Sequence, residues 1–241
     1  MITENGIVLT EVNYGETSKI INILTENHGV IGVYAKGART LKSKFRTTSS
    51  KLTYGQFFIK YNKEKMSYLN DVTVINNFKN IMKDIIKIGY ANYLLDLTNQ
   101  VIKEGITDYI LPNLLSALKK IDNGMDPKII TSIIEIKYLE NLGVMPILDS
   151  CVSCGTKTNI ATISSYKGGF LCNDCKENEP IISEKAIKLI RLFSLVDIEK
   201  IDKLEISDSV IEEITNFIND YYERYTGLYM KTKQFLKSLI K

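Results

Sequence analysis

The first 80 residues alternate short apolar runs with polar turns. Val, Ile, Phe and Tyr dominate the runs, and Gly, Asn and Asp separate them, as in the stretch 14–17 (YGET). β-Branched and aromatic residues grouped in this way are typical of strands. The pattern predicts five strands, near residues 7–9, 20–24, 30–35, 56–61 and 68–75. They indicate a compact all-β domain, for which a small barrel of the OB type, a sandwich and an SH3-like fold all remain open.

Beyond residue 80 the spacing of apolar residues changes to a helical period. Apolar positions in 81–101 recur at intervals of three and four, which places them on one helix face. Asp126 followed by Pro127 predicts a helix start, and Gly143 predicts the end of that helix. The stretch 209–212 (SVIE) has the form of a capping box, and a last amphipathic segment follows near the C-terminus. The sequence therefore predicts an α+β chain, with a β domain followed by a helical one.

All four cysteines fall within one short window that interrupts the helical region. They form two pairs, Cys151-x2-Cys154 and Cys172-x2-Cys175, with 17 residues between the pairs. This spacing is that of a structural zinc site, in which four thiolates surround the metal and leave no open position for catalysis. Two disulfides, a redox pair and four unrelated thiols remain as alternatives, although a cytoplasmic chain does not favour disulfides. Residues 156–171 are expected to form a short hairpin between the pairs.

Charge is distributed unevenly along the chain. The whole sequence carries a net charge of +3, but residues 1–80 hold 11 Lys and Arg against 6 Asp and Glu. The remaining residues hold 31 − 11 = 20 basic against 28 − 6 = 22 acidic side chains, and residues 221–241 are again basic. Such asymmetry suggests a face that binds a polyanion.

The basic residues of the N-terminal third concentrate in the segment 36–51, which we call the cationic segment. It contains six Lys or Arg residues, no Asp or Glu, and many small or hydroxylated residues. Cations neutralise phosphates, and hydroxyl and backbone N–H groups add neutral phosphate contacts. One or two nearby aromatic residues are expected to stack on bases. The candidates are Tyr34, Phe45, Tyr54, Phe57 and Tyr61. On charge alone, a solvated loop and a nucleic-acid-binding surface are equally compatible with the segment.

The sequence offers no recognisable catalytic motif. There is no phosphate-binding loop of the Walker type, no dinucleotide fingerprint and no H-E-x-x-H. The single histidine, His28, lies in a turn and is expected to be solvated. Together these features favour a binding protein over an enzyme. The N-terminus lacks the features of a signal peptide and no window suits a membrane span, so the expected location is the cytoplasm.

Four stretches of the chain together resemble the RecO family of bacterial DNA repair proteins. They are "GIVLTEVNYGETSKIINILTENHG", "AKGARTLKSKFR", "YLENLGVMPILDSC" and "YTGLYMKTKQFL". The first two carry the Y-G-E-[TS] turn and the A-K-G-[AV]-R segment of that family, and the third precedes the cysteines as in its zinc-bearing members. The fourth departs from the family pattern because the usual His is absent beside Tyr229 and Met230. The resemblance spans essentially the full chain.

The resemblance implies an OB-fold over 1–80 and a helical domain over 81–241, interrupted by a zinc finger at 148–178. It also implies a recombination mediator of the RecF pathway without catalytic turnover. Such proteins bind single- and double-stranded DNA and anneal complementary strands. With RecR they help to load RecA onto single strands coated with single-stranded DNA-binding protein (SSB), whose acidic C-terminal tail they engage.

The resemblance also suggests site residues. The expected DNA contacts are Lys19, Lys36, Arg39, Lys42, Lys44 and Arg46. The acidic SSB tail is expected near Lys231 or Lys233, since cations beside an apolar groove suit such a peptide. The implied location is cytoplasmic and nucleoid-associated. The alternative is a zinc-stabilised nucleic-acid-processing enzyme or a transcriptional regulator, and Mg²⁺-dependent strand cleavage would distinguish that enzyme from a mediator.

Overall fold

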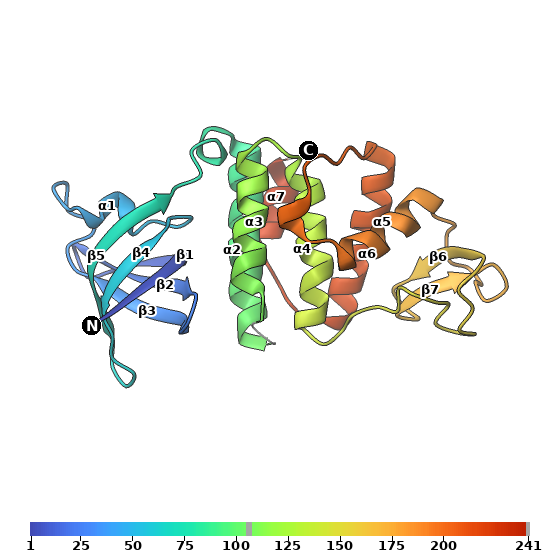
Figure 1. Cartoon of the computed structure of the whole chain (residues 1–241), viewed down its shortest axis with the longest axis horizontal. Helices are drawn as coiled ribbons and strands as arrows, with labels where there is room; N and C mark the ends of the chain where they lie inside the picture. Colours follow the sequence, from blue (N-terminus) through green and yellow to red (C-terminus); the bar gives the residue numbers. More distant parts are fainter. Residues whose placement is uncertain (105–107, 240–241) are drawn as a thin grey trace. The chain divides into compact units, whose positions relative to one another are not determined.

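The computed structural model describes residues 1–104 and 108–239, so residues 105–107 and the last two residues of the predicted helical domain lie outside it (Figure 1). Five strands form an N-terminal barrel and two more form a separate hairpin. The strands are β1 (Ile2–Tyr14), β2 (Ser18–Thr25), β3 (Gly29–Ala35), β4 (Tyr54–Lys60), β5 (Ser67–Asn76), β6 (Ile160–Ser164) and β7 (Gly169–Cys172). All five strands predicted in the first 80 residues are confirmed, and each is longer than its apolar run or shifted only slightly from it.

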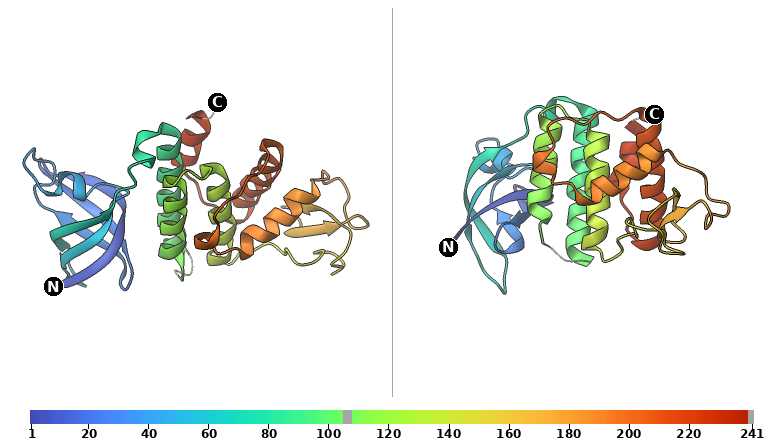
Figure 2. Two further views of the ribbon diagram at one scale, coloured as in Figure 1. Left: turned by 45° about the horizontal axis from the view of Figure 1, so that its top comes forward. Right: turned by 45° about the vertical axis from the view of Figure 1, so that its right-hand side comes forward.

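The barrel closes in the strand order β1-β2-β3-β5-β4, with β4 returning to β1. Its neighbours are antiparallel except β3 and β5, which pair in parallel. A closed five-stranded barrel with this crossover is an OB-fold, so the first of the three predicted alternatives is confirmed. Its curved strands, blue to teal, are visible in both views of Figure 2.

Alternation along the strands explains why the barrel forms. Every second residue of β3 is buried, and the corresponding positions of β2 and β4 face the same interior. The interior cluster consists of Val8, Ile21, Ile23, Ile31, Val33, Ala35, Ala38, Phe57, Ile59 and Leu69. A register shift between Val8 and Thr10 bends β1, so that this long strand pairs with both β2 and β4.

The helices occupy most of the chain beyond residue 80. They are η1 (Ile81–Lys83), α2 (Ile85–Glu104), α3 (Ile110–Asp122), α4 (Pro127–Asn141), α5 (Glu184–Leu195), η2 (Ile198–Lys200), α6 (Asp208–Tyr225) and α7 (Lys231–Leu239), while the short α1 (Phe45–Thr48) lies in the cationic segment. None of the described helices combines the length and apolar character that a membrane-spanning segment needs.

The predicted ends of α4 are confirmed in atomic detail. The Asp126 carboxylate accepts a hydrogen bond from the Lys128 N–H at 2.7 Å, and Pro127 is the first helical residue. At the other end Gly143 adopts φ of +70°. Its N–H donates to the Glu140 carbonyl, and the Val144 N–H donates to the Leu139 carbonyl. These two bonds are those of a Schellman motif, which requires the left-handed conformation that glycine tolerates.

The predicted capping box at 209–212 is wrong. Helix α6 already begins at Asp208, with Ser207 at the N-cap position, so Ser209 lies inside the helix. The reason is that two serines flank the helix start, and the sequence pattern alone does not choose between them. The apolar spacing does not predict helices α3 and α5, although α5 has a clear N-cap at Ser183, whose hydroxyl accepts a hydrogen bond from the Ala186 N–H.

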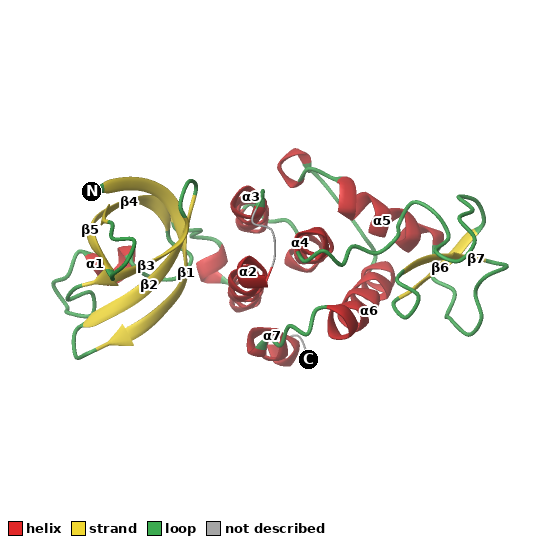
Figure 3. Ribbon diagram, turned by 90° about the horizontal axis from the view of Figure 1, so that it is seen from below, coloured by secondary structure: helices red, strands yellow, loops and turns green. Residues whose placement is uncertain are grey.

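The chain separates into two compact units. Of the described residues, the first contains 1–99, 109–118 and 232–239, and the second contains 100–104, 108 and 119–231. In the second unit α4, α5 and α6 pack against one another, and α5 also contacts β6 of the hairpin (Figure 3). Helices α2 and α7 belong largely to the first unit. The boundary between the two units therefore does not coincide with the change from strands to helices near residue 80. The division into domains 1–80 and 81–241 stays a prediction.

Candidate nucleic-acid interface and metal centre

The cationic segment is anchored to the barrel rather than free. Ala38 is fully buried in the barrel interior and Phe45 packs against the same cluster. The Arg39 N–H donates to the Thr17 carbonyl at 2.7 Å, which ties the segment to the turn between β1 and β2. The expectation of a simple loop therefore needs correction, because residues Phe45–Thr48 form a helical turn, α1. These anchors fix the backbone from which the cations project.

Five of the six predicted DNA contacts lie on this segment and are exposed. They are Lys36, Arg39, Lys42, Lys44 and Arg46. None of the ion pairs found within the described chain involves Lys36, Lys42 or Arg46. The structure therefore brings five cations together on one short, well-anchored stretch of backbone.

Two of these cations have partners in the protein. The Arg39 guanidinium donates through Nη1 to the Gly15 carbonyl at 3.2 Å. The Lys44 ammonium lies 2.9 Å from the Asp71 carboxylate on β5. The hydrogen bond from Lys44, followed by one from the Val72 N–H, holds the pKa of Asp71 below its ordinary value. Lys44 is thus partly neutralised, whereas the neutral carbonyl partner leaves the charge of Arg39 intact.

The sixth predicted contact, Lys19, has a different environment. It lies on β2, and its ammonium is 2.6 Å from the Glu11 carboxylate on β1. Only 13% of its side chain is exposed. An ion pair with little access to solvent braces the two strands, and it leaves Lys19 the least accessible member of the predicted set.

The predicted stacking residues also differ in how far they are buried. Phe57 is fully buried in the barrel, so it is part of the core. Phe45 and Tyr54 are partly buried, and Tyr61 lies beside the His28 ring with 5.4 Å between the ring centroids. Tyr34 is half-buried on the outer face of β3. It lies two residues before Lys36, the first cation of the cationic segment.

His28 lies in the turn between β2 and β3 and is exposed, as expected, but it also has a partner in the barrel. Its Nδ1 lies 2.9 Å from the buried Glu4 carboxylate on β1, and the Asn27 N–H donates to the other oxygen of the same carboxylate at 3.2 Å. Glu4 is thereby satisfied inside the barrel wall, and the turn between β2 and β3 is fastened to β1. Sequence gave no signal for this pair because its members are 24 residues apart.

The C-terminal cations lie on α7. Lys231, at its first position, is exposed, and Lys233 places its ammonium 5.4 Å from the centroid of the Tyr93 ring. Between them, the Thr232 hydroxyl donates to the Asp96 carboxylate at 2.6 Å. The cation–π contact and the hydrogen bond fix the first turn of α7, which is where the acidic SSB tail was expected.

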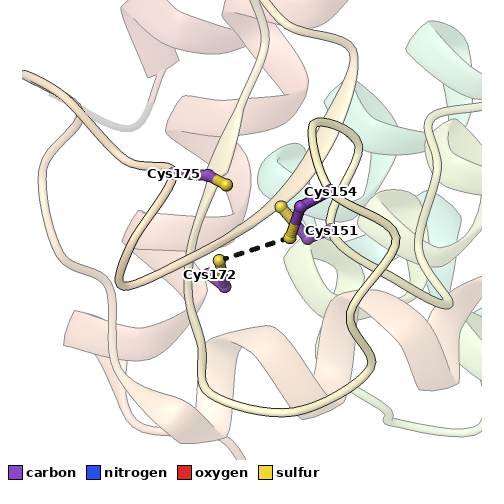
Figure 4. Close-up of side chains that lie close together, drawn as sticks. All are labelled: Cys151, Cys154, Cys172 and Cys175. Atoms are coloured by element: carbon purple, nitrogen blue, oxygen red, sulfur yellow. Dashed lines mark hydrogen bonds between the residues drawn. The ribbon is translucent and has the colours of Figure 1, made fainter.

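The four cysteines converge as the spacing predicted (Figure 4). Their Sγ atoms all lie within 4.8 Å of one another, and the Cys154 and Cys172 sulfurs are 3.7 Å apart. A disulfide would need sulfurs about 2.05 Å apart, so the disulfide alternative does not describe this arrangement. A tetrahedron of thiolates about 2.3 Å from a metal has edges of roughly 3.8 Å, close to the observed spacing. The cysteines are therefore placed to bind a metal ion.

Local backbone turns present these sulfurs. In the first pair Gly155 adopts φ of +77°, and its N–H donates to the Cys151 carbonyl at 2.8 Å. In the second pair the Cys175 N–H donates to the Cys172 carbonyl at 3.2 Å. The predicted hairpin between the pairs is confirmed as β6 and β7, and β7 ends at Cys172.

The thiols are electrostatically coupled. Burial raises the pKa of Cys151, but backbone N–H groups of Cys172, Cys154 and Ser153 outweigh it and bring the value to about 6. The Cys175 thiol donates hydrogen bonds to Cys154 and then Cys172, which favours its protonated form and raises the pKa of Cys175 to about 12. Four thiols at this spacing resist joint ionisation, and a bound cation is what stabilises all of them as thiolates.

Comparison with known proteins finds matches along nearly the full length of the chain. The family model "Recombination protein O N terminal" matches residues 1–78, and "Recombination protein O C terminal" matches residues 82–234. Curated relatives named "DNA repair protein RecO" include those of Bacillus pumilus (33% identical, 99% of this chain and 94% of the relative) and Bacillus subtilis (33%, 99% and 95%). The relative from Listeria monocytogenes is 32% identical over 98% of this chain and 94% of its own length. The two family models, which follow one another over the barrel and the helical region, and these relatives show that the chain belongs to the RecO family of DNA repair proteins.

Proposed function

We propose that this protein is a recombination mediator that binds single- and double-stranded DNA and anneals complementary strands without catalytic turnover. The observation that carries the proposal is the cationic segment, whose exposed cations stand on a backbone held by Ala38 and Phe45. Because the backbone is already ordered, binding to the regularly spaced phosphates of a strand has to order only the cationic side chains. Membership of a family named for DNA repair supports the same reading.

The proposed phosphate contacts are not equivalent. Lys36, Lys42 and Arg46 are exposed and form no ion pair within the described chain, so they are expected to contribute most. Arg39 contributes from a fixed position, and Lys44 contributes less while Asp71 neutralises it. Lys19 belongs to the same proposal, but replacing it should alter affinity mainly by loosening β1 from β2.

Salt dependence tests the segment. Replacing Lys36, Lys42 and Arg46 together by Ala removes three phosphate contacts, and each contact with a single strand adds about 0.7 to the slope of log affinity against log salt. The variant should therefore bind single strands more weakly, with a slope shallower by about 2. An unchanged slope would remove the segment from the binding site.

A matched control removes the same charge elsewhere. Lys188, Lys200 and Lys203 are highly exposed and lie in the second compact unit. Their joint replacement by Ala changes the net charge equally, so it should leave the slope close to that of the wild type. If both triple variants lose affinity alike, net charge and not the cationic segment would account for binding.

The proposed partners are RecR, the acidic tail of SSB and, indirectly, RecA. Lys231 and Lys233 are proposed to meet the tail, with Lys233 held over Tyr93. The decisive assay is annealing of complementary strands coated with SSB, in the absence of nucleotide and added Mg²⁺. Annealing that improves when RecR is added and then supports RecA loading would fit a cytoplasmic, nucleoid-associated mediator.

The competing candidate is a nucleic-acid-processing enzyme, and the same reactions test it. Mg²⁺-dependent cleavage of either strand would refute the mediator proposal. For the metal we propose a single structural Zn²⁺ held by Cys151, Cys154, Cys172 and Cys175, because all four positions are thiolates and none is left for substrate. Native mass spectrometry should find one zinc per chain, and a folded chain that carries none contradicts the proposal.

A further inference from the structure

Three tyrosines from separate strands meet on the outer face of the barrel. Tyr34 of β3 lies between Tyr14 of β1 and Tyr68 of β5, with ring centroids 5.7 Å and 5.5 Å apart. The planes of the outer two rings are inclined at 88° and 79° to that of Tyr34. Tyr34 and Tyr68 are direct partners in the parallel pairing of β3 with β5, so the ladder itself sets their separation. We call these residues the tyrosine row; their strands are labelled in Figure 1.

The barrel core does not require this row. None of the three tyrosines belongs to the interior cluster, and Tyr14 and Tyr68 are 56% and 50% exposed. Val12, which is also exposed, and Ile20 continue the same outer face, since Val12 pairs with Ile20 and Ile20 pairs with Tyr34. Apolar and aromatic side chains gathered on an outer face and left in water mark a surface that meets a ligand.

Hydrogen bonds connect the tyrosine row to the cationic segment. The Tyr34 hydroxyl donates to the Ser18 hydroxyl oxygen at 2.9 Å, and the Gly37 N–H donates to the same oxygen at 3.0 Å. Ser18 is buried and is the strand partner of Tyr14. Gly37 directly follows Lys36 and adopts φ of +65°, which a glycine tolerates. One buried hydroxyl therefore positions both the middle ring and the first residues of the cationic segment.

This juxtaposition fits one class of ligand. Phosphates need cations, and unpaired bases offer flat faces that stack on aromatic rings regardless of sequence. A duplex buries its base faces, so the rings discriminate in favour of a single strand. We propose that the tyrosine row is a stacking platform for the bases of a single nucleic-acid strand whose phosphates lie along the cationic segment. The inference rests on the proposed function. It adds a contact for the bases, whereas the cations contact only the phosphates.

The test separates base contacts from phosphate contacts. The probes are an oligo(dT) of about 15 nucleotides, within the usual site size of an OB-fold, and an abasic oligonucleotide of equal length and charge. Wild-type protein should bind oligo(dT) at least about a hundredfold more tightly than the abasic strand, about tenfold for each exposed ring. The variant Tyr14→Thr/Tyr68→Thr keeps good strand formers at both positions and removes the rings. It should lose about tenfold in oligo(dT) affinity for each tyrosine and bind the abasic strand as the wild type does.

Two further variants control for folding and for exposed aromatic residues in general. Tyr14→Phe/Tyr68→Phe restores the rings and should restore most of the preference for oligo(dT). Tyr229→Thr removes an exposed tyrosine of the second compact unit and should leave the preference at its wild-type value. Circular dichroism and the thermal midpoint check that each variant is folded.

The outcomes distinguish the two proposals. A folded Thr variant that keeps the preference for oligo(dT), or a wild type that binds both strands equally, overturns the platform alone and assigns the tyrosines to another contact, such as a protein surface. Wild-type protein that binds neither probe overturns the proposed function and the platform together. Loss of base preference in the Thr variant, combined with normal binding by the Lys36, Lys42 and Arg46 variant, keeps the platform and overturns the phosphate assignment.

Discussion

Replacing Asp71 by Asn should strengthen DNA binding, which is an unusual direction for a substitution beside a binding surface. Asp71 pairs with Lys44 at 2.9 Å, and the two side chains are 53% and 61% exposed. The hydrogen bond from Lys44 and that from the Val72 N–H lower the pKa of the carboxyl, so it stays ionised well below neutral pH. A phosphate that approaches Lys44 is therefore repelled by the Asp71 carboxylate, which lies 2.9 Å from the Lys44 ammonium. Asn keeps the size of the side chain and an oxygen for the Val72 N–H, but removes the charge.

The size of the effect follows from the number of phosphates neutralised. Freeing Lys44 adds at most one contact, so the log–log salt slope for a single strand should steepen by about 0.7. Between about 200 mM and about 50 mM salt, a fourfold change, the ratio of variant to wild-type affinity should then rise by about 2.6-fold. The gain should be largest at low salt, where charges at an exposed site are least screened.

The assay is fluorescence anisotropy with labelled oligo(dT) at several salt concentrations. Asp197→Asn is the matched control, because Asp197 also pairs with an exposed lysine, Lys200 at 3.1 Å, and belongs to the second compact unit. Both variants gain the same net charge, but only Asp71→Asn should steepen the slope. A slope equal to that of the wild type, or weaker binding at low salt, would refute the reasoning that Lys44 is a phosphate contact held back by Asp71.

Three other predictions concern stability. Chelation of the metal should increase amide hydrogen exchange in the β6–β7 hairpin and leave exchange in the barrel strands unchanged, because metal binding contributes to the free energy of folding of the part that holds it. Equal exchange in the hairpin with and without chelator would contradict this. Gly169→Ala places Cβ 2.5 Å from the Ile147 carbonyl oxygen and should cost about 1–3 kcal/mol by chemical denaturation, whereas Gly32→Ala, whose nearest neighbour is 3.5 Å away, should be tolerated. Tyr222→Phe removes a buried hydrogen bond of 2.7 Å to the Glu135 carbonyl and should lower the free energy of unfolding by about 1 kcal/mol; no loss would mean that the carbonyl's remaining partners suffice.

Features encoded by local spacing could be predicted from the sequence. The alternation of apolar residues predicted the five barrel strands, and the paired cysteines at 151–154 and 172–175 predicted the metal site with its hairpin. The start of α4 at Asp126 and its end at Gly143 were also readable. In each case the residues that define the feature are neighbours along the chain, so their spacing carries the geometry.

Contacts between distant residues could not be predicted in the same way. Periodicity tells which side of a strand is buried, but it does not tell which strand lies beside it, so the order that sets β5 against β3 came only with the fold. The Lys44–Asp71 pair, which partly neutralises a cation, and the His28–Glu4 pair, which gives an exposed histidine a partner, both join residues more than 20 positions apart.

The tyrosine row shows the division most clearly. The sequence placed Tyr34 at the end of a strand beside the cationic segment, and it gave no reason to connect that residue with Tyr14 or Tyr68. Closure of the barrel brings the three rings within 5.7 Å of their neighbours. The sequence by itself determined the strands, the cations and the thiolates, because these depend on residue type and local period. Only the tertiary structure decided which side chains face one another, because strand pairing joins residues that the chain keeps far apart.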